Sequence, residues 1–443
     1  MSYLGLAHDS PDSNCGSFKN KKLLTDPYHL THRENLVRDD PSRLAIFGDA
    51  PAFSEPLHVG RPNIGDRERL LARINSLLDR RWLSNNGPYV QELEQRLAEF
   101  IGVRHCIAMC NATIALEIVI RALGLKDEVI VPSFTFIATA HALQWQEITP
   151  VFCDIDPLTH NLDPERVVQA LTPRTTGIIG VHVWGRPCNV EALSEIARSH
   201  RLKLVFDSAH ALGCSHKGTM IGCFGDAEIF SFHATKFVNS FEGGAVVTND
   251  DELARKIRLM KNFGFAGYDN VVSIGTNGKM SEVSAAMGLG SLESFDVFIN
   301  SNRNNYDEYQ RNLAGIPGLM LVSYDKSEKC NYQYVVVEVD ELRTGLSRNQ
   351  LMEVLWAENV LARRYFYPGC HRMEPYRSTL PQAGRLLPVT EELVQRVLVL
   401  PTGTAVSADD ITKICDIIRT VVSNHSLVRT KLEQRRTAIG TAP

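Results

Sequence analysis

The chain has 443 residues, of which 44% are hydrophobic and 22% charged; this composition is typical of a folded globular protein, and the length predicts two domains. Its 47 Lys and Arg nearly balance its 51 Asp and Glu, which excludes a strong overall field for nucleic acid or an anionic membrane. No apolar stretch reaches the roughly 18 residues of a membrane-spanning helix, and the first residues lack the pattern of a secretion signal. We therefore expect a cytoplasmic protein with neither a nucleic-acid nor a membrane partner.

The N-terminal part of the chain lacks a clear periodic pattern. Residues 1–60 are polar, with paired charges and several prolines, which predicts an extended and partly disordered arm. Apolar residues then recur at helical spacing over 66–79 and again from Tyr89 to a glycine stop at Gly102, so both segments are predicted to be helices.

From residue 105 onward, short apolar strands alternate with amphipathic helices. The predicted strands are 105–109, 128–132, 149–155, 176–184 and 202–207. The predicted helices are 112–125, 136–145, 164–172 and 190–200. This alternation predicts a mostly parallel central sheet with helices on both faces, as in α/β proteins.

The pattern changes in the last part of the chain. Residues 242–250 are predicted to be a short return strand, and a long helical stretch from about Ser281 leads to a smaller C-terminal α+β domain. In that domain we predict a strand at 332–340 and helices at 348–360 and 409–425. The domains predicted are an arm (1–60), a large domain (61–305), a small domain (306–425) and a frayed tail (426–443).

Polar residues gather where three predicted strands end, and ligands of such sheets lie beyond the carboxyl ends of the strands. Asp207 directly follows an apolar strand, with His210 three residues later. The next strand ends in SFHATK, which contains Ser231, His233 and Lys236. The third segment, Asn111–Thr113, lies at a junction between a strand and a helix.

These residue types match what an aldehyde-bearing pyridine phosphate requires. Lys236 supplies an amine for an imine, Asp207 a carboxylate that keeps the pyridine nitrogen protonated, and Phe136 an aromatic plane for the ring. The turn at 111–113 supplies helix-start N–H groups for the phosphate. Each residue alone has a plainer explanation as a cap, a solvated lysine, a core aromatic or an N-cap. Their joint occurrence in one α/β pattern favours a cofactor site.

Ten dispersed cysteines form no C-x-x-C pair, and the chain has no H-E-x-x-H, P-loop or G-x-S-x-G motif. Several of the cysteines lie in apolar runs, where a reduced cysteine behaves as a small hydrophobic residue. We therefore expect no metal site and no disulfide framework.

A series of segments between about Ala45 and Arg419 resembles the DegT/DnrJ/StrS family of sugar aminotransferases, which have fold type I and depend on pyridoxal 5′-phosphate. The segments include NNGPYVQELE, CNATIALEIVIRALG, DEVIVPSFTFIATAHAL, FDSAHALG, SFHATKFVNSFEGGAVVTND and GTNGKMSEVSAAMGLGSLE. Their order and spacing together are highly specific. The resemblance implies a large domain with a mostly parallel sheet and a smaller C-terminal α+β domain.

The resemblance also implies roles for individual residues. Lys236 matches the family's Schiff-base lysine, Asp207 the carboxylate on the pyridine nitrogen, His210 its neighbour near the ring hydroxyl, and Phe136 the stacked aromatic residue. The positions that match phosphate contacts are Ala112, Thr113 and Ser231. Asn277 matches a residue that reaches the phosphate from the other subunit, which implies a homodimer with shared active sites, and Lys279 lies where basic residues are common.

Two features of the motifs bear on the activity. The phosphate turn is C-N-A-T where many relatives have S-G-T, so Asn111 is a candidate for an additional contact. A branch of the family replaces the lysine by histidine and catalyses dehydration, whereas this chain keeps Lys236. The motif thus favours amino transfer.

The substrate is indicated by resemblance alone. Residues 57–88, HVWGRPC and YFYPGCHRMEPY look most like the branch that aminates C4 of dTDP-4-keto-6-deoxy-D-glucose, with L-glutamate as the family's usual donor. Amination of a 3-keto sugar or a cyclitol ketone, a non-catalytic binding protein, and acyl-CoA-type or racemase chemistry remain open. The candidates for binding a diphosphate are Arg186, Arg363, Arg364 and Arg372, each equally suited to an ion pair. Trp184 and Tyr367 are candidates for a sugar or base contact, although a place in the core is more typical of such residues.

Overall fold

The computed structural model describes residues 40–439. Most of the predicted arm, residues 1–39, therefore lies outside the described chain. Residues 40–60 form two 3-10 helices, Pro41–Arg43 and Ala45–Phe47, and the strand β1 (Leu57–His58), which pairs in parallel with β13 (Val360–Leu361). Glu358 anchors this segment, because its carboxylate accepts the backbone N–H groups of Ala45 at 2.6 Å and Ala52 at 2.8 Å. These residues pack on the C-terminal domain.

The central sheet has seven strands, and all but one run in parallel. Their order is β2 (His105–Met109), β10 (Gly244–Thr248), β9 (Ala227–Ser231), β6 (Lys203–Asp207), β5 (Thr175–Val181), β3 (Glu128–Pro132) and β4 (Thr149–Cys153). The predicted return strand is β10, which lies inside the sheet and is antiparallel to both β2 and β9. The mostly parallel sheet that the alternation predicted is thus confirmed.

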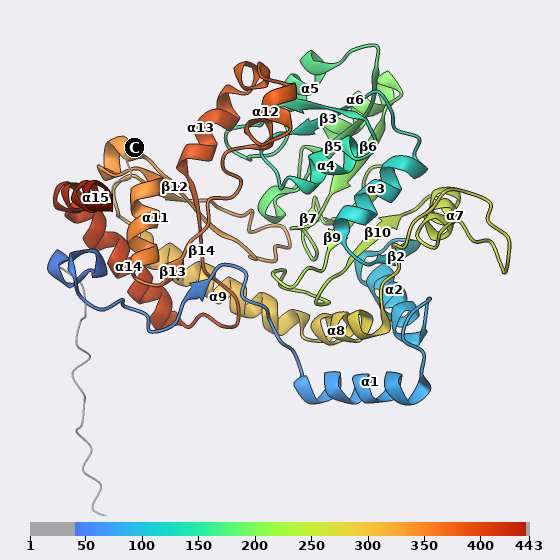
Figure 1. The fold of residues 1–443 in the computed structure, drawn as a ribbon, viewed down its shortest axis with the longest axis horizontal. Helices are drawn as coiled ribbons and strands as arrows, with labels where there is room; N and C mark the ends of the chain where they lie inside the picture. Colours follow the sequence, from blue (N-terminus) through green and yellow to red (C-terminus); the bar gives the residue numbers. More distant parts are fainter. Residues whose placement is uncertain (1–39, 440–443) are drawn as a thin grey trace, which may run out of the picture. The chain divides into compact units, whose positions relative to one another are not determined.

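Helices cover both faces of the sheet (Figure 1). Successive strand residues pack on opposite faces: Ile107 and Met109 face α3, α4 and α7, whereas Cys106 and Ala108 face α2 and α8. Farther along the sheet, α5 and α6 cover that second face. The helices are α1 (Arg67–Arg80), α2 (Pro88–Ile101), α3 (Ala112–Ala122), α4 (Ala138–Gln144), α5 (Pro164–Ala170), α6 (Val190–His200), α7 (Asp251–Met260) and α8 (Glu282–Glu293). This burial on two faces explains why the strands have almost continuous apolar sequences.

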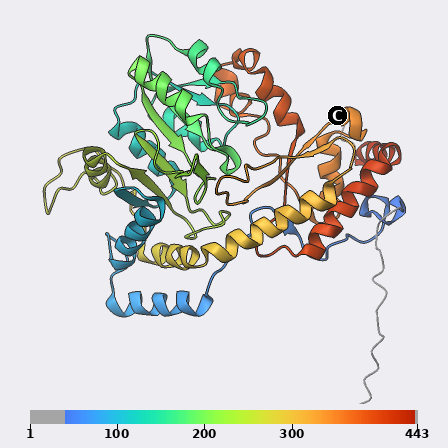
Figure 2. The same cartoon turned by 180° about the vertical axis from the view of Figure 1, so that it is seen from behind.

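The long helical stretch after Ser281 is two helices. α8 ends at Glu293, Ser294 leaves the helical region, and α9 (Phe295–Leu313) follows at once. α9 extends from the sheet to the C-terminal domain, where it packs along α14 (Ala408–Ser423) (Figure 2). The two domains are therefore joined by a rigid element and not by a flexible linker.

The C-terminal domain is built on an antiparallel sheet of β11 (Leu319–Leu321), β12 (Val335–Val339) and β14 (Val397–Leu400). The helices of this part of the chain are α10 (Glu341–Thr344), α11 (Arg348–Ala357), α12 (Tyr376–Thr379), α13 (Pro388–Arg396), α14 and α15 (His425–Ile439). Of these, α12 packs on the large domain, because its Tyr376 is buried in the core of that domain. The remaining short elements come from different parts of the described chain. They are the hairpin of β7 (Ser215–His216) and β8 (Thr219–Met220) and the 3-10 helices Val183–Gly185, Cys370–Arg372 and Ala383–Leu386.

The prediction of a frayed tail from residue 426 was wrong. α15 packs on α14 and buries Val428 and Leu432 completely in the core of the C-terminal domain. The apolar residues of this helix are few, so its sequence alone resembled a solvated end. Among the described residues, the helices are all too short or too polar to cross a membrane.

Candidate active site

One cavity of about 360 Å³ collects the polar residues from the strand ends. It lies at the carboxyl ends of β6 and β9 and at the start of α3, and is closed by residues of the C-terminal domain. Its lining includes all the residues that we predicted as cofactor contacts within one subunit: Ala112, Thr113, Phe136, Asp207, His210, Ser231 and Lys236. Segments far apart in the sequence thus converge as the topology predicted.

Lys236 lies in the turn after β9, where its backbone N–H donates to the carbonyl of His233 at 2.8 Å. Its side chain is half-buried, and the part that stays accessible faces the cavity. Nζ donates a hydrogen bond to the hydroxyl of Tyr334 at 3.1 Å. Burial lowers the pKa of Lys236 to about 8, although the charge of Asp207 opposes this change. A substantial fraction of the amine is therefore neutral near physiological pH, as a nucleophile or a base requires.

Asp207 is the last residue of β6 and is buried. Its Oδ2 accepts a hydrogen bond from Thr139 Oγ1 at 2.9 Å, and its Oδ1 accepts the N–H of Ala209 at 3.1 Å. Burial raises the pKa of this carboxyl, while the two hydrogen bonds and the charge of Lys236 oppose the rise. A buried carboxylate that lines a cavity and has only neutral hydrogen-bond donors suits a cationic ligand atom, such as a protonated ring nitrogen.

His210 is held by a stack of aromatic rings. Its ring lies nearly parallel to those of Trp184 and Phe366, with centroid distances of 6.0 and 5.8 Å. Its Nδ1 accepts the N–H of Trp184 at 3.3 Å, which leaves the proton of the neutral ring on Nε2. Burial and the charge of Lys236 lower the pKa of His210 well below its ordinary value. The ring is therefore neutral and a hydrogen-bond donor.

A buried chain of hydrogen bonds extends from this ring into the C-terminal domain. Trp184 Nε1 lies 3.2 Å from His160 Nδ1, and His160 Nε2 lies 3.1 Å from Glu338 Oε1 on β12. Trp184 is completely buried, so it belongs to the core and does not contact a ligand. The preference for a core position was correct for this residue.

The start of α3 provides the N–H groups for an anion. Asn111 is the N-cap, and its Oδ1 accepts the N–H of Ile114 at 2.8 Å. The amides of Ala112 and Thr113 have no acceptor within the helix, because they belong to its first turn. The strand β10 approaches this turn so closely that a Cβ on Gly244 would lie 2.8 Å from the nitrogen of Ala112. Asn111 thus orders the turn as a cap and leaves these two donors for a phosphate.

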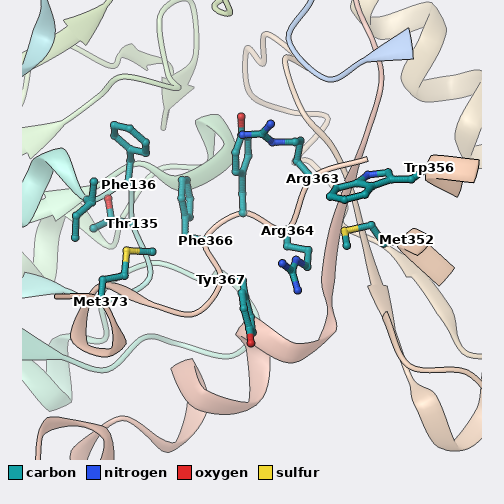
Figure 3. Close-up of a pocket in the computed structure, with 11 residues that line it drawn as sticks. Thr135, Phe136, Met352, Trp356, Arg363, Arg364, Phe366, Tyr367 and Met373 are labelled. Carbon is teal, nitrogen blue, oxygen red and sulfur yellow. The ribbon is translucent and has the colours of Figure 1, made fainter. Parts of the chain in front are cut away.

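Phe134 and Phe136 have different environments although they are two residues apart. Phe134 is fully buried, whereas 59% of Phe136 is exposed and borders the cavity. Figure 3 shows the Phe136 ring away from the neighbouring aromatic residues. A large aromatic side chain left open beside a buried carboxylate and a lysine suits a planar ring. The lysine, carboxylate, aromatic face and helix start together fit pyridoxal 5′-phosphate.

The sequence analysis missed several residues of the cavity. Thr139 lies in α4 in an apolar context, and no motif marked its hydroxyl as a partner of Asp207. The C-terminal domain contributes Tyr334, Arg363, Tyr365 and Phe366. These four residues are about 100 or more positions from Lys236, so only the tertiary fold brings them to the site.

Asn277 and Lys279 do not line this cavity. Asn277 is exposed and forms an isolated antiparallel bridge with Asn262. Lys279 Nζ donates to Asn262 Oδ1 at 3.0 Å and lies 4.6 Å from the centre of the Phe263 ring. The predicted contribution of Asn277 to a second subunit's site stays a prediction.

The four arginines that were candidates for binding a diphosphate have different environments in the structure. Arg186 donates to the carbonyl of Leu158 at 2.8 Å and Arg372 pairs with Glu391, and neither lines a cavity of this region. Arg364 borders a neighbouring cavity together with Tyr367, while Arg363 borders both that cavity and the one that contains Lys236. Of the four candidate arginines, Arg363 is thus the one that lines the same cavity as Lys236.

Comparison with known proteins gives consistent results. The sequence matches the DegT/DnrJ/EryC1/StrS aminotransferase family over residues 65–419. It is 39% identical to a dTDP-4-amino-4,6-dideoxy-D-glucose transaminase of Shigella dysenteriae, over 83% of this chain and 100% of the relative. Identity to a transaminase of the same name from Escherichia coli is 36%, over 81% of this chain and 97% of the relative.

A solved structure of DesI in the presence of its TDP-sugar product has a TM-score of 0.83 and 52% sequence identity, and covers 90% of this chain and 99% of that chain. These matches confirm the predicted fold class and aminotransferase activity, and with them the predicted pyridoxal 5′-phosphate cofactor. The chain belongs to the DegT/DnrJ/EryC1/StrS aminotransferase family.

Proposed function

We propose that this protein transfers the amino group of L-glutamate to C4 of dTDP-4-keto-6-deoxy-D-glucose, giving dTDP-4-amino-4,6-dideoxy-D-glucose. The observation that carries the proposal is the convergence of Lys236, Asp207 and Phe136 on one cavity with a helix start. The choice of sugar is supported by the names of the two similar transaminases and by the TDP-sugar product of DesI.

The side chains of the cavity have distinct tasks in this reaction. Lys236 would hold the cofactor covalently, and Asp207 would keep a proton on the ring nitrogen. The phosphate would be held by the amides of Ala112 and Thr113 and by Ser231, which lines the same cavity. When bound, the cofactor supplies an electron sink for the negative charge that develops on the carbon bearing the amino group.

Lys236 is also the group placed to move protons. Once released from the cofactor, its amine would take the proton from the α-carbon of glutamate and deliver it to the cofactor within the same half of the reaction. In the second half it would move a proton in the opposite direction, to C4 of the sugar. Its pKa of about 8 leaves it partly neutral at pH 7 to 8. The hydrogen bond to Tyr334 keeps Nζ in the cavity. The aromatic residues Tyr334 and Phe366 line the cavity from the side of the C-terminal domain.

We further propose that the active unit is a homodimer, in which Asn277 reaches the phosphate of the partner's cofactor. Asn277 is exposed and does not line the cavity of its own subunit, although its motif matches that of a phosphate contact. Molecular mass in solution would test the dimer, and loss of cofactor affinity in Asn277→Ala would test the contact. We also propose that the protein acts in the cytoplasm.

The test of the proposed reaction is product formation from glutamate labelled with ¹⁵N. We expect glutamate to change the absorbance of the holoenzyme, and dTDP-4-keto-6-deoxy-D-glucose to reverse the change with transfer of the label to C4. Lys236→Ala is expected to lose both steps. Lys256→Ala, a lysine exposed on α7, is the matched control and should retain them.

The same assay separates the rival reactions. Transfer only to a 3-keto sugar nucleotide or a cyclitol ketone would replace the proposed acceptor. A holoenzyme whose spectrum does not respond to any amino donor would contradict amino transfer altogether and favour a binding protein.

A further inference from the structure

The segment between β1 and α1 contacts the turn that carries Lys236. β1 pairs with β13, and residues 59–66 then lead to α1, which Figure 1 shows in blue. Gly60 lies against Thr235, the residue before Lys236, because a Cβ on Gly60 would be 2.9 Å from the Cβ of Thr235. The φ of Gly60 is +74°, so both the backbone conformation and the close approach favour glycine here. The position of the lysine turn thus depends on a segment that lies outside the central sheet.

Asn63 is the residue of this segment that connects the two domains. It is buried. Its Nδ2 donates to the carbonyl of Phe237, the residue after Lys236, at 3.2 Å, and its own carbonyl accepts Nδ2 of Asn239 at 2.9 Å. On the other side, its Oδ1 accepts the backbone N–H of Thr404 at 3.1 Å and the hydroxyl of Thr404 at 2.8 Å. One side-chain amide therefore joins the lysine turn to the C-terminal domain.

The contact at Thr404 continues to Tyr334. Thr404 follows β14, and Leu400, the last residue of β14, is paired with Val335 on β12. Tyr334 directly precedes Val335, and its hydroxyl accepts the hydrogen bond from Lys236 Nζ at 3.1 Å. Lysine and tyrosine are thus connected twice, directly by this hydrogen bond and indirectly through Asn63 and the sheet of the C-terminal domain.

An asparagine suits this position because its amide offers a donor and an acceptor at once. The donor meets the backbone of the large domain, and the acceptor meets the backbone and a hydroxyl of the C-terminal domain. A buried polar group that loses its partner is unfavourable. Without Asn63 the lysine turn and the loop after β14 are therefore expected to rearrange.

We propose that Asn63 is a positioning residue for Lys236, which holds the turn of the lysine against the C-terminal domain so that Nζ stays in contact with Tyr334. This role rests on the proposed function, in which Lys236 binds the cofactor. Asn63 does not line the cavity that contains Lys236, so it acts through the position of the backbone. The titratable groups that line this cavity with the lysine are Asp207, His210, His233, Glu242, Tyr334, Arg363 and Tyr365. A substitution at Asn63 changes none of these groups chemically.

The test is the pH dependence with which pyridoxal 5′-phosphate attaches to the full-length apoenzyme, followed by visible absorbance. The wild type should show an inflection at the pKa of Lys236, about 8. Asn63→Ala should lower this inflection by about one pKa unit, because the ammonium form of the lysine loses its hydrogen bond to Tyr334. Asn300→Ala, the same exchange at an exposed position of α9, is the matched control and should leave the inflection in place.

The double variant Asn63→Ala/Tyr334→Phe distinguishes positioning from a general loss of stability. Both changes remove the same contact, so its inflection should lie within about 0.3 pKa units of that of Tyr334→Phe alone. Full addition of the two shifts would overturn the proposal. An inflection that stays in place in Asn63→Ala, while denaturant unfolds this variant more easily than the wild type, would show a structural role only and would also overturn it.

Thr404→Val is a milder change that decides the question if Asn63→Ala does not fold. It removes the hydroxyl that Asn63 accepts but keeps the backbone N–H, so we expect a fall of about half a pKa unit. Thr404→Ser should restore the inflection of the wild type. An unshifted inflection in a folded Thr404→Val variant would then overturn the proposal.

The site of attachment separates this inference from the proposed function. Borohydride reduction of the holoenzyme followed by peptide mass analysis identifies the lysine that holds the cofactor. Attachment at Lys236 with an unshifted inflection in the variants would refute the role of Asn63 alone. Attachment at another lysine would refute the proposed function, and the role of Asn63 with it.

Discussion

Replacement of Tyr334 by Phe is expected to lower the pKa of Lys236. The phenol oxygen accepts a hydrogen bond from Lys236 Nζ at 3.1 Å, and burial raises the pKa of Tyr334 well above its ordinary value, so the phenol is neutral. A neutral acceptor stabilises the ammonium form of the lysine. Removing it therefore favours the neutral amine.

The size of the change follows from the strength of the lost bond. A hydrogen bond to a charged group contributes about 1.5–3 kcal/mol, which corresponds to about 1–2 pKa units. Lys236 borders a cavity that water can enter, so part of this energy is recovered and a fall of about one pKa unit is expected. The pKa of Lys236 should fall from about 8 to about 7 in Tyr334→Phe.

The assay is the pH dependence of cofactor attachment to the apoenzyme, followed by visible absorbance. Only the neutral amine attacks the aldehyde, so the rate reports the neutral fraction of Lys236. Tyr365→Phe removes the hydroxyl of another tyrosine of the cavity, for which no bond to Lys236 is found among the described residues, and serves as the control. An inflection near 8 that stays in place in Tyr334→Phe, or moves upward, would refute this reasoning.

Two further substitutions probe the support of the cofactor and the C-terminal helix. Thr139→Val removes a hydrogen-bond donor to Asp207, so it should raise the pKa of this carboxyl further and weaken cofactor binding about 10-fold. Titration of the apoenzyme with the cofactor measures this affinity. Thr139→Ser should restore the affinity, and unchanged affinity in the valine variant would speak against the role of Thr139. Leu432→Ala should reduce the free energy of unfolding by about 2–5 kcal/mol because the side chain is fully buried. Denaturant titration measures this free energy. The control Arg435→Ala, at an exposed residue, should change the free energy of unfolding by about 0.5 kcal/mol or less. An unchanged free energy of unfolding in Leu432→Ala would mean that α15 does not stabilise the domain.

The large domain was predictable from local patterns. Strands such as β3 and β6 are short apolar runs between amphipathic helices, and this alternation fixes both their type and their parallel direction. The position of β10 was not predictable in the same way. Its sequence shows a strand, but its insertion between β2 and β9 depends on pairing with β2, whose residues lie far away in the sequence.

The residues of the candidate site also differ in whether their own segments of sequence could predict them. Asp207, His210 and Lys236 follow strands, so the general rule for ligands at the carboxyl ends of a sheet found them. Tyr334 and Arg363 belong to the other domain, and nothing in their own segments indicates a contact with Lys236 or its cavity. Their contribution depends on the packing of two domains, which periodicity in a single sequence does not describe.

β12 and the residue before it contact the active site at two places. Tyr334, directly before this strand, binds Lys236, and Glu338 on it connects through His160 and Trp184 to His210. The lysine and the histidine belong to the large domain, whereas both contacts come from the small domain. A displacement of this one strand would therefore alter the basicity of the lysine and the orientation of the imidazole together. The position of this strand on the large domain thus determines the surroundings of both the lysine and the imidazole.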